Sequence, residues 1–142
     1  MIIPKSILEQ VKGFDPDFFM YGEELELCDR IRKLGYKIKY YDEVSAVHLH
    51  GGSTPNSNWS LMQKEVSNQL YFRKKFGFSG YLLLHFLRIF NLFTNFIAMW
   101  LLDKNYRKGY YQVNKIYFKS MKYFFTILFW KKKKNRFLKV SI

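Results

Sequence analysis

The stretch from Phe14 to Arg30 carries the residue types in this chain that are best suited to chemistry. It reads FDPDFFMYGEELELCDR, which places aromatic rings beside a dense group of carboxylates. No helix breaker occurs from Glu23 to Leu34, and Gly35 supplies a stop signal, so a helix is expected there. Apolar side chains at helical spacing mark its expected buried face: Leu27, Ile31 and Leu34.

Glu24 is the candidate catalytic residue of this helix. Projected back one turn, the apolar stripe meets Glu24, so we expect this carboxylate at the mouth of the helix on its buried face. Glu23, Glu26 and Arg30 are expected on the solvated side, where Glu26 and Arg30 can pair at i,i+4. A carboxylate at the edge of an apolar surface can act as a general base toward a hydroxyl. The alternative is that acids in a first helical turn only complement the helix dipole.

The order and spacing of many residues across this stretch carry a family resemblance. Phe14-Asp15, Phe18-Phe19, Tyr21, Glu23-Glu24, Glu26-Leu27 and Arg30 follow the order F-D-x-x-F-F-x-Y-x-E-D-x-D-L-x-x-R. This pattern resembles the acceptor-side motif of glycosyltransferase family 2. Gly13, Gly35-Tyr36 and the later run from His48 to Ser53 are similar to its rhamnosyltransferase-like branch. The resemblance covers roughly Ile2 to Gly77.

The resemblance implies a fold, a mechanism and site residues. The fold would be the C-terminal part of a GT-A-type, Rossmann-like α/β domain, followed by amphipathic helices. Glu24 stands where the family has its catalytic base, although the family has Asp there and at Glu26. His48 would complete a Mg²⁺ or Mn²⁺ site, which needs the donor-binding half that would lie before Met1. The acceptor pocket would be formed by Phe18, Phe19, Tyr21, Glu23 and Trp59, and the loop near the donor diphosphate by Gly51, Gly52 and Ser53.

Asp15-Pro16-Asp17 has the D-x-D spacing of a divalent-cation site. Carboxylate oxygens two residues apart can bind Mg²⁺ or Mn²⁺. Pro16, however, favours a turn at this position, and we take the turn as the main interpretation.

Periodicity predicts the remaining elements. A short helix is expected over Pro4–Val11, after a strand end at Ile2-Ile3, and a longer helix from Trp59 to about Phe76. Alternating apolar residues predict strands at Tyr36–Tyr40 and Val44–Leu49. Two further amphipathic stretches follow, at Tyr81–Leu102 and Lys115–Trp130. We expect two regions, 1–77 and 78–142.

The composition and charge of the chain indicate which kinds of partner it can have. The 142 residues are 49% hydrophobic and 20% aromatic, which excludes a disordered chain, and the net charge is +13. His85, Arg88, Asn91 and Asn95 form a polar stripe on the first amphipathic stretch, and lysines line the second. Such helices suit the surface of an anionic membrane, peripherally on its cytoplasmic face. The alternative is that they pack on the chain's own core or on a partner. No nucleic-acid-binding motif occurs, so nucleic acid is not an expected partner.

The resulting hypothesis is an inverting glycosyltransferase, or its acceptor-side fragment. It would transfer a sugar from a nucleotide-sugar donor to a cell-surface polysaccharide or a lipid-linked acceptor. A separate N-terminal half is a further expected partner. The alternative is a non-catalytic truncated remnant or a membrane-associated partner subunit.

Overall fold

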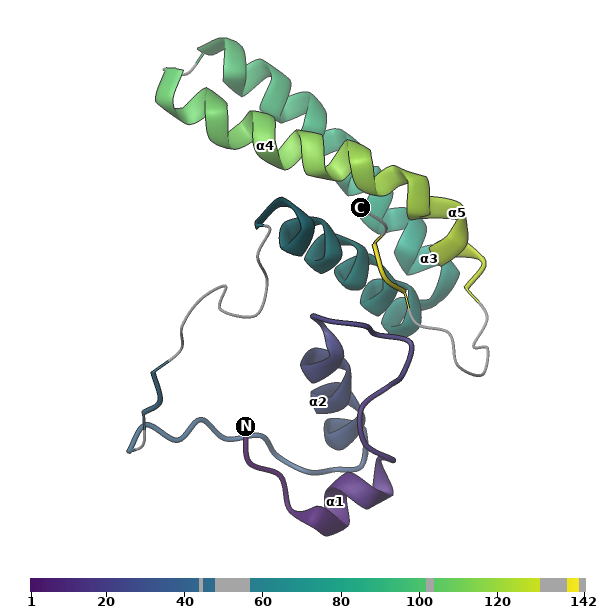
Figure 1. Ribbon diagram of the computed structural model, residues 1–142. Helices are drawn as coiled ribbons and strands as arrows, with labels where there is room; N and C mark the ends of the chain where they lie inside the picture. Colours follow the sequence, from purple (N-terminus) through teal and green to yellow (C-terminus); the bar gives the residue numbers. More distant parts are fainter. Residues whose placement is uncertain (44, 48–56, 102–103, 131–137, 141–142) are drawn as a thin grey trace.

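The structure is a computed structural model that describes residues 1–43, 45–47, 57–101, 104–130 and 138–140. Its elements lie in three tiers, with the short N-terminal helices at one end and a long helical hairpin at the other (Figure 1). In chain order the elements are α1 (Lys5–Gln10), α2 (Glu23–Lys33), α3 (Ser57–Leu101), α4 (Lys104–Ser120), the 3₁₀ turn η1 (Met121–Tyr123) and α5 (Phe124–Leu128).

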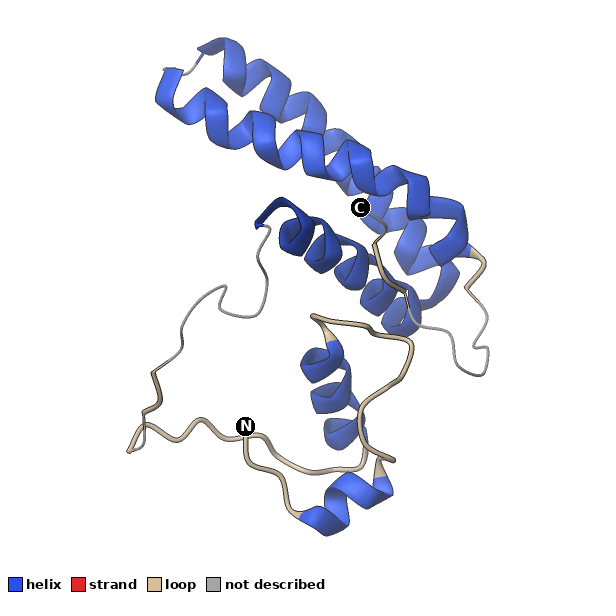
Figure 2. Cartoon of the chain, in the orientation of Figure 1, coloured by secondary structure: helices blue, strands red, loops and turns tan. Residues whose placement is uncertain are grey.

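The expected α/β fold is wrong for the described residues. Figure 2 shows helices joined by loops there, and the β-type pairing is one isolated parallel bridge between Phe18 and Leu138. Residues 36–40 are irregular and exposed, and residues 2–3 and 45–47 are likewise not strands. Residues 36–40 have no neighbouring strand among the described residues, and a strand needs such a partner to satisfy its backbone hydrogen-bonding groups. The rest of the strand predicted at Val44–Leu49 lies outside the described residues.

Helix α2 confirms the helix predicted at Glu23. It begins after Gly22 and ends at Lys33, and Gly35 then takes the left-handed conformation, with φ of 88°, that favours glycine. The predicted ion pair is also present, with Arg30 Nη2 2.7 Å from Glu26 Oε2. The same guanidinium donates to the backbone oxygens of Val11 and Gly13, which ties α2 to the end of α1. The small core between the two helices is formed by Val11, Leu27 and Ile31, with Ile3, Ile7 and Leu8 against it.

Helix α3 consists of two arms. Gly77 has φ of 71° and ψ of −162°, which breaks the helix between residues 76 and 78. The first arm confirms the helix predicted from Trp59 to about Phe76, and the second matches the stretch predicted at Tyr81–Leu102 as far as Leu101. The main core joins the first arm to both ends of the chain. Its buried members are Phe18, Met62, Val66, Leu70, Tyr81, Ile127, Leu128, Leu138 and Val140.

The second arm of α3 lies beside α4 as an antiparallel hairpin (Figure 1). The polar stripe of the second arm turns toward α4. His85 Nδ1 is 3.0 Å from the Tyr117 hydroxyl, and Asn95 donates to Asn114 at 3.3 Å. His85 and Asn95 therefore lie on the inner side of the hairpin, whereas Asn91 is exposed. The helix predicted at Lys115–Trp130 is interrupted, because α4 ends at Ser120 and η1 follows.

Candidate functional site

The loop that leads into α2 is held to the first arm of α3 by one lysine and two carboxylates. The Lys74 ammonium contacts Asp15 and lies 2.5 Å from Asp17 Oδ2. Asp17 is fully buried, and Trp130 Nε1 donates to it at 3.0 Å. The backbone N–H of Asp17 donates to Asp15 Oδ1 at 3.0 Å, which confirms the turn at Asp15-Pro16-Asp17. Because both carboxylates already pair with the Lys74 ammonium, this turn gives no support to a metal site. The described residues contain no group of three or more His, Cys, Asp or Glu side chains suited to a metal.

A buried polar chain fixes the end of this loop. Ser67 Oγ donates to the Met20 carbonyl at 2.8 Å, and Gln63 Nε2 donates to Ser67 Oγ at 3.0 Å. The Gln63 amide also pairs with the C-terminal segment, donating to Leu138 O at 2.9 Å and accepting from Val140 N at 2.8 Å. The loop, the first arm and residues 138–140 therefore form one rigid unit. Sequence reasoning missed Gln63 and Ser67, because polar residues on a helix give no sign of which backbone groups they will meet.

The backbone turns sharply just before the acids. Tyr21 and Gly22 both have positive φ, 66° and 84°. A Cβ at Gly22 would lie 3.5 Å from the Phe18 ring, an ordinary contact, so glycine is favoured there by the backbone angle and not by space. At Tyr21 a left-handed conformation costs about 1–2 kcal/mol. Strain of this kind is concentrated at functional sites.

Two of the predicted acceptor-site aromatics meet here although they are far apart in the sequence. The rings of Phe19 and Trp59 pack edge to face, with centroids 6.2 Å apart. Trp59 Nε1 donates to Val140 O at 3.2 Å, and the Lys139 ammonium lies 4.7 Å above the Phe19 ring. Phe19 remains 37% exposed, so this aromatic wall is open to a ligand, whereas Phe18 is buried in the core.

The two acids at the start of α2 lie on different sides from those predicted. Glu24 is exposed, and Glu23 is half-buried, with an Oε2 atom that is buried and has no hydrogen-bond partner among the described residues. The expectation that Glu24 lies on the buried face is therefore wrong. Leu27 and Ile31 are buried, but Leu34 is 52% exposed, so the buried face follows an i,i+4 row that leads back to Glu23.

The arrangement supports binding of a hydroxylated ligand. The exposed Glu24 carboxylate is accessible to a hydroxyl proton. Glu23, next to it in the sequence, is half-buried, and a carboxylate can accept hydrogen bonds from ligand hydroxyls. His48, Gly51, Gly52 and Ser53 lie outside the described residues, so the predicted metal and diphosphate contacts stay predictions.

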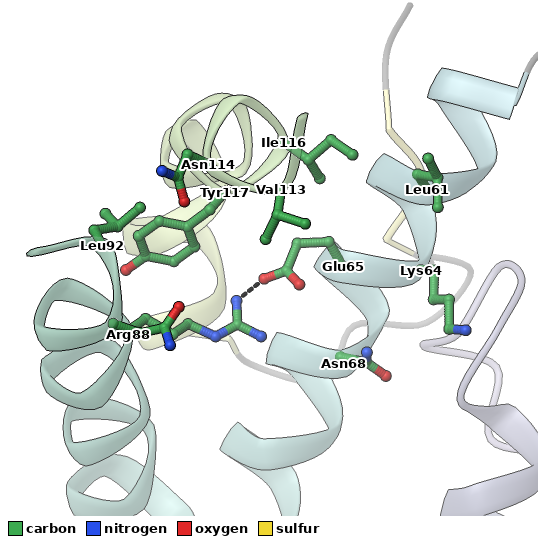
Figure 3. A pocket seen from close by; sticks show the side chains of 11 residues that line it. Leu61, Lys64, Glu65, Asn68, Arg88, Leu92, Val113, Asn114, Ile116 and Tyr117 are labelled. Atoms are coloured by element: carbon green, nitrogen blue, oxygen red, sulfur yellow. Dashed lines mark ion pairs between the residues drawn. The ribbon is translucent and has the colours of Figure 1, made fainter. Parts of the chain in front are cut away.

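A pocket of about 400 Å³ lies elsewhere, between the two arms of α3 and α4 (Figure 3). Arg88 and Glu65 point toward each other within it and form an ion pair. Glu65 was missed by sequence reasoning, although it is the only acidic residue in α3 and hence the natural partner of Arg88. The pocket does not include the residues of the predicted acceptor site.

Comparison with known proteins relates the chain to one class of enzyme. No family model matches it, and no solved structure matches it. Over 78 residues, 54% of this chain and 23% of the relative, it is 35% identical to the low-salt glycan biosynthesis hexosyltransferase Agl10 of Haloferax volcanii. Over 54 residues, 38% of this chain and 18% of the relative, it is 35% identical to an N-acetylglucosaminyl-diphospho-decaprenol L-rhamnosyltransferase of Mycobacterium tuberculosis.

A third similarity is to the rhamnosyltransferase WbbL of Escherichia coli, with 35% identity over 48 residues, which are 34% of this chain and 18% of the relative. The chain thus spans about a fifth of the length of these curated relatives. All three act in glycosyl transfer by name, and the chain is accordingly related to glycosyltransferases.

Proposed function

We propose that this chain forms the acceptor side of an inverting glycosyltransferase of family 2, in its rhamnosyltransferase-like branch. The observation that carries the proposal is the packing of Trp59, from α3, against Phe19 on the loop that leads into the acid pair Glu23-Glu24. An aromatic wall beside carboxylates suits a sugar, because its apolar ring face packs on the aromatic side chains and its hydroxyls donate to oxygen acceptors. The similarity to named rhamnosyl- and hexosyltransferases supports the same conclusion.

In the proposed reaction Glu24 accepts the proton of an acceptor hydroxyl as that oxygen attacks the anomeric carbon of the donor. The new C–O bond forms as the bond to the diphosphate breaks, and the electron pair leaves with the diphosphate. The nucleotide sugar would be held by a part of the relatives that this chain does not span. A divalent cation, held in part by His48, would offset charge on the departing diphosphate.

Glu23 is assigned to acceptor binding. Its half-buried carboxylate would accept a hydrogen bond from a second hydroxyl and so orient the sugar for attack. We infer a lipid-linked glycan as the acceptor class. The mycobacterial relative is named for a glycosyl diphosphate carried on a polyprenol, and the hairpin of this chain has a large apolar, basic surface.

The proposal is tested in a chimera that replaces the matching segment of the Escherichia coli rhamnosyltransferase with that of this chain. Rhamnose transfer to the acceptor of that enzyme is measured. Glu24→Gln should lower kcat by about 100-fold or more, the usual loss when a general base is removed. Glu23→Gln should mainly raise KM.

Glu9→Gln is the matched control, since Glu9 is an exposed acid in α1 that pairs with the exposed Lys5. It should leave transfer unchanged. Normal turnover of a folded Glu24→Gln chimera would remove Glu24 from the role of base. A folded chimera that is inactive with Glu24 present would favour the non-catalytic alternative.

A further inference from the structure

The hairpin of the second α3 arm and α4 has polar hydrogen bonds on its inner side. Asn95 donates to Asn91 at 2.8 Å and to Asn114 across the hairpin at 3.3 Å, and His85 meets the Tyr117 hydroxyl at 3.0 Å. Amphipathic helices that pair in water bury their apolar faces against each other. Polar side chains that hold helices together from within are typical of helices surrounded by lipid.

The outer face of the same hairpin is apolar and open. Most of the large apolar side chains of the second arm are exposed, although the helix is long and apolar enough to cross a membrane. Trp100, near the end of this arm, is 82% exposed. Soluble monomers rarely leave a continuous aromatic surface of this kind uncovered. Its most exposed large side chains are Phe86, Phe90, Phe93, Phe96, Trp100 and Leu101.

A row of cations runs along α4, the other helix of the hairpin, and into η1. Lys108, Lys115, Lys119 and Lys122 recur at helical spacing and are exposed. No acidic residue follows Asp103 in the sequence, so nothing in α4 neutralises this row. Lysines of this number cannot lie in the hydrocarbon core of a bilayer, but they match the depth of its anionic headgroups.

We propose that this hairpin seats in one leaflet of an anionic membrane. The aromatic face of the second arm packs among the acyl chains, and the lysine row of α4 contacts lipid phosphates. By length and composition Asn58–Leu101 is the one helix among the described residues that qualifies as a membrane span. The break at Gly77 and the Arg88–Glu65 ion pair hold it bent, which suits a shallow position over a straight crossing.

Lipid is the occupant that uses both surfaces. A second copy of the chain would cover the aromatic face but would bring two bodies of net charge +13 together. Nucleic acid would pair with the lysine row but would leave the aromatic face in water. An anionic leaflet covers the aromatic face and neutralises the lysine row.

The test uses the whole chain with vesicles of phosphatidylcholine, with and without phosphatidylglycerol. Brominated lipid should quench the tryptophan fluorescence, and Trp100→Phe should remove most of that quenching, because Trp59 and Trp130 are part of the core packing. The double change Phe90→Ser and Phe93→Ser should weaken binding to both vesicle types by more than about tenfold. Lys115→Gln with Lys119→Gln should weaken binding to the anionic vesicles alone, by about 30-fold.

Leu25→Ser and Lys33→Gln are the controls, since both change exposed residues of α2, away from the hairpin, and both should leave binding unchanged. Circular dichroism confirms that each variant remains folded. Unquenched Trp100 in a chain that forms a soluble dimer would overturn the proposal, as would equal binding by the hairpin variants and the controls. Binding to duplex DNA at physiological salt in place of vesicles would also overturn it.

Discussion

Replacing Lys74 by methionine tests how the acid-bearing loop is held in place. The Lys74 ammonium is the cation that contacts Asp15 and Asp17, and the Asp17 side chain is only 1% exposed. Methionine keeps the apolar stem of lysine and removes the charge. Asp17 would then keep one neutral donor, Trp130 Nε1, for a fully buried carboxylate. Removing one partner of a buried ion pair costs about 3–5 kcal/mol in folding free energy.

For a chain of this size, 1 kcal/mol corresponds to about 3 °C in the melting temperature, so Lys74→Met should lower it by about 10 °C. Thermal unfolding followed by circular dichroism measures this shift. Adding Asp17→Asn to Lys74→Met should recover most of the loss, because the buried group is then neutral. Lys64→Met, on an exposed part of the same arm, should change stability by less than about 0.5 kcal/mol. A Lys74→Met chain as stable as that control would refute the reasoning.

Two further predictions concern pH and backbone conformation. Two hydrogen bonds lower the pKa of the Asp29 carboxyl below its ordinary value, the one from Lys75 more strongly than the one from Tyr71. The ionised Asp29 therefore stabilises the fold fully above the pKa of the unfolded chain, and this contribution is lost as the pH falls through the lower pKa of the folded chain. Tyr71→Phe should raise the Asp29 pKa in an NMR titration and move the acid loss of stability to higher pH; an unchanged pKa contradicts this. Gly77→Ala should destabilise by about 1–3 kcal/mol because of its backbone angles, whereas Gly109→Ala, within α4 and with open space around its Cβ, should stabilise by about 0.5–1 kcal/mol. The free energies of unfolding are measured with urea. A change of the same sign in both glycine variants would contradict the different backbone roles given to Gly77 and Gly109.

The sequence predicts α2 well because every signal for it is local. The acids of its first turn, the pair of Glu26 with Arg30 and the left-handed Gly35 all act within a few residues of each other. The buried face of the same helix depends on what packs against it. Leu34 looks like part of the apolar stripe, yet it is exposed and is not part of the core between α1 and α2. Because the prediction included Leu34 in the buried face, it placed Glu24 on that face in place of Glu23.

The strand prediction failed for a related reason. The alternation of apolar residues at Tyr36–Tyr40 is a local feature of five residues, whereas a strand forms only when its backbone hydrogen-bonds to a second strand. No neighbour is present among the described residues, so the segment stays irregular. The contacts that bring Phe19 to Trp59, or Gln63 to Leu138, are equally non-local, and they depend on how the first arm of α3 lies against the loop and the C-terminal segment.

The polar stripe of the second α3 arm shows most clearly what a single helix cannot reveal. Its spacing correctly marks one face as polar, but periodicity gives no sign of whether that face meets water or another helix. Arg88 directs the polar face inward, because a guanidinium within a long apolar run needs a countercharge. Glu65 on the first arm supplies that charge. Once Arg88 is directed inward, His85 and Asn95 on the same face must follow, and the aromatic side chains are left outside. The orientation of the whole hairpin, and with it the surface offered to lipid, therefore depends on one ion pair between residues in different arms of α3.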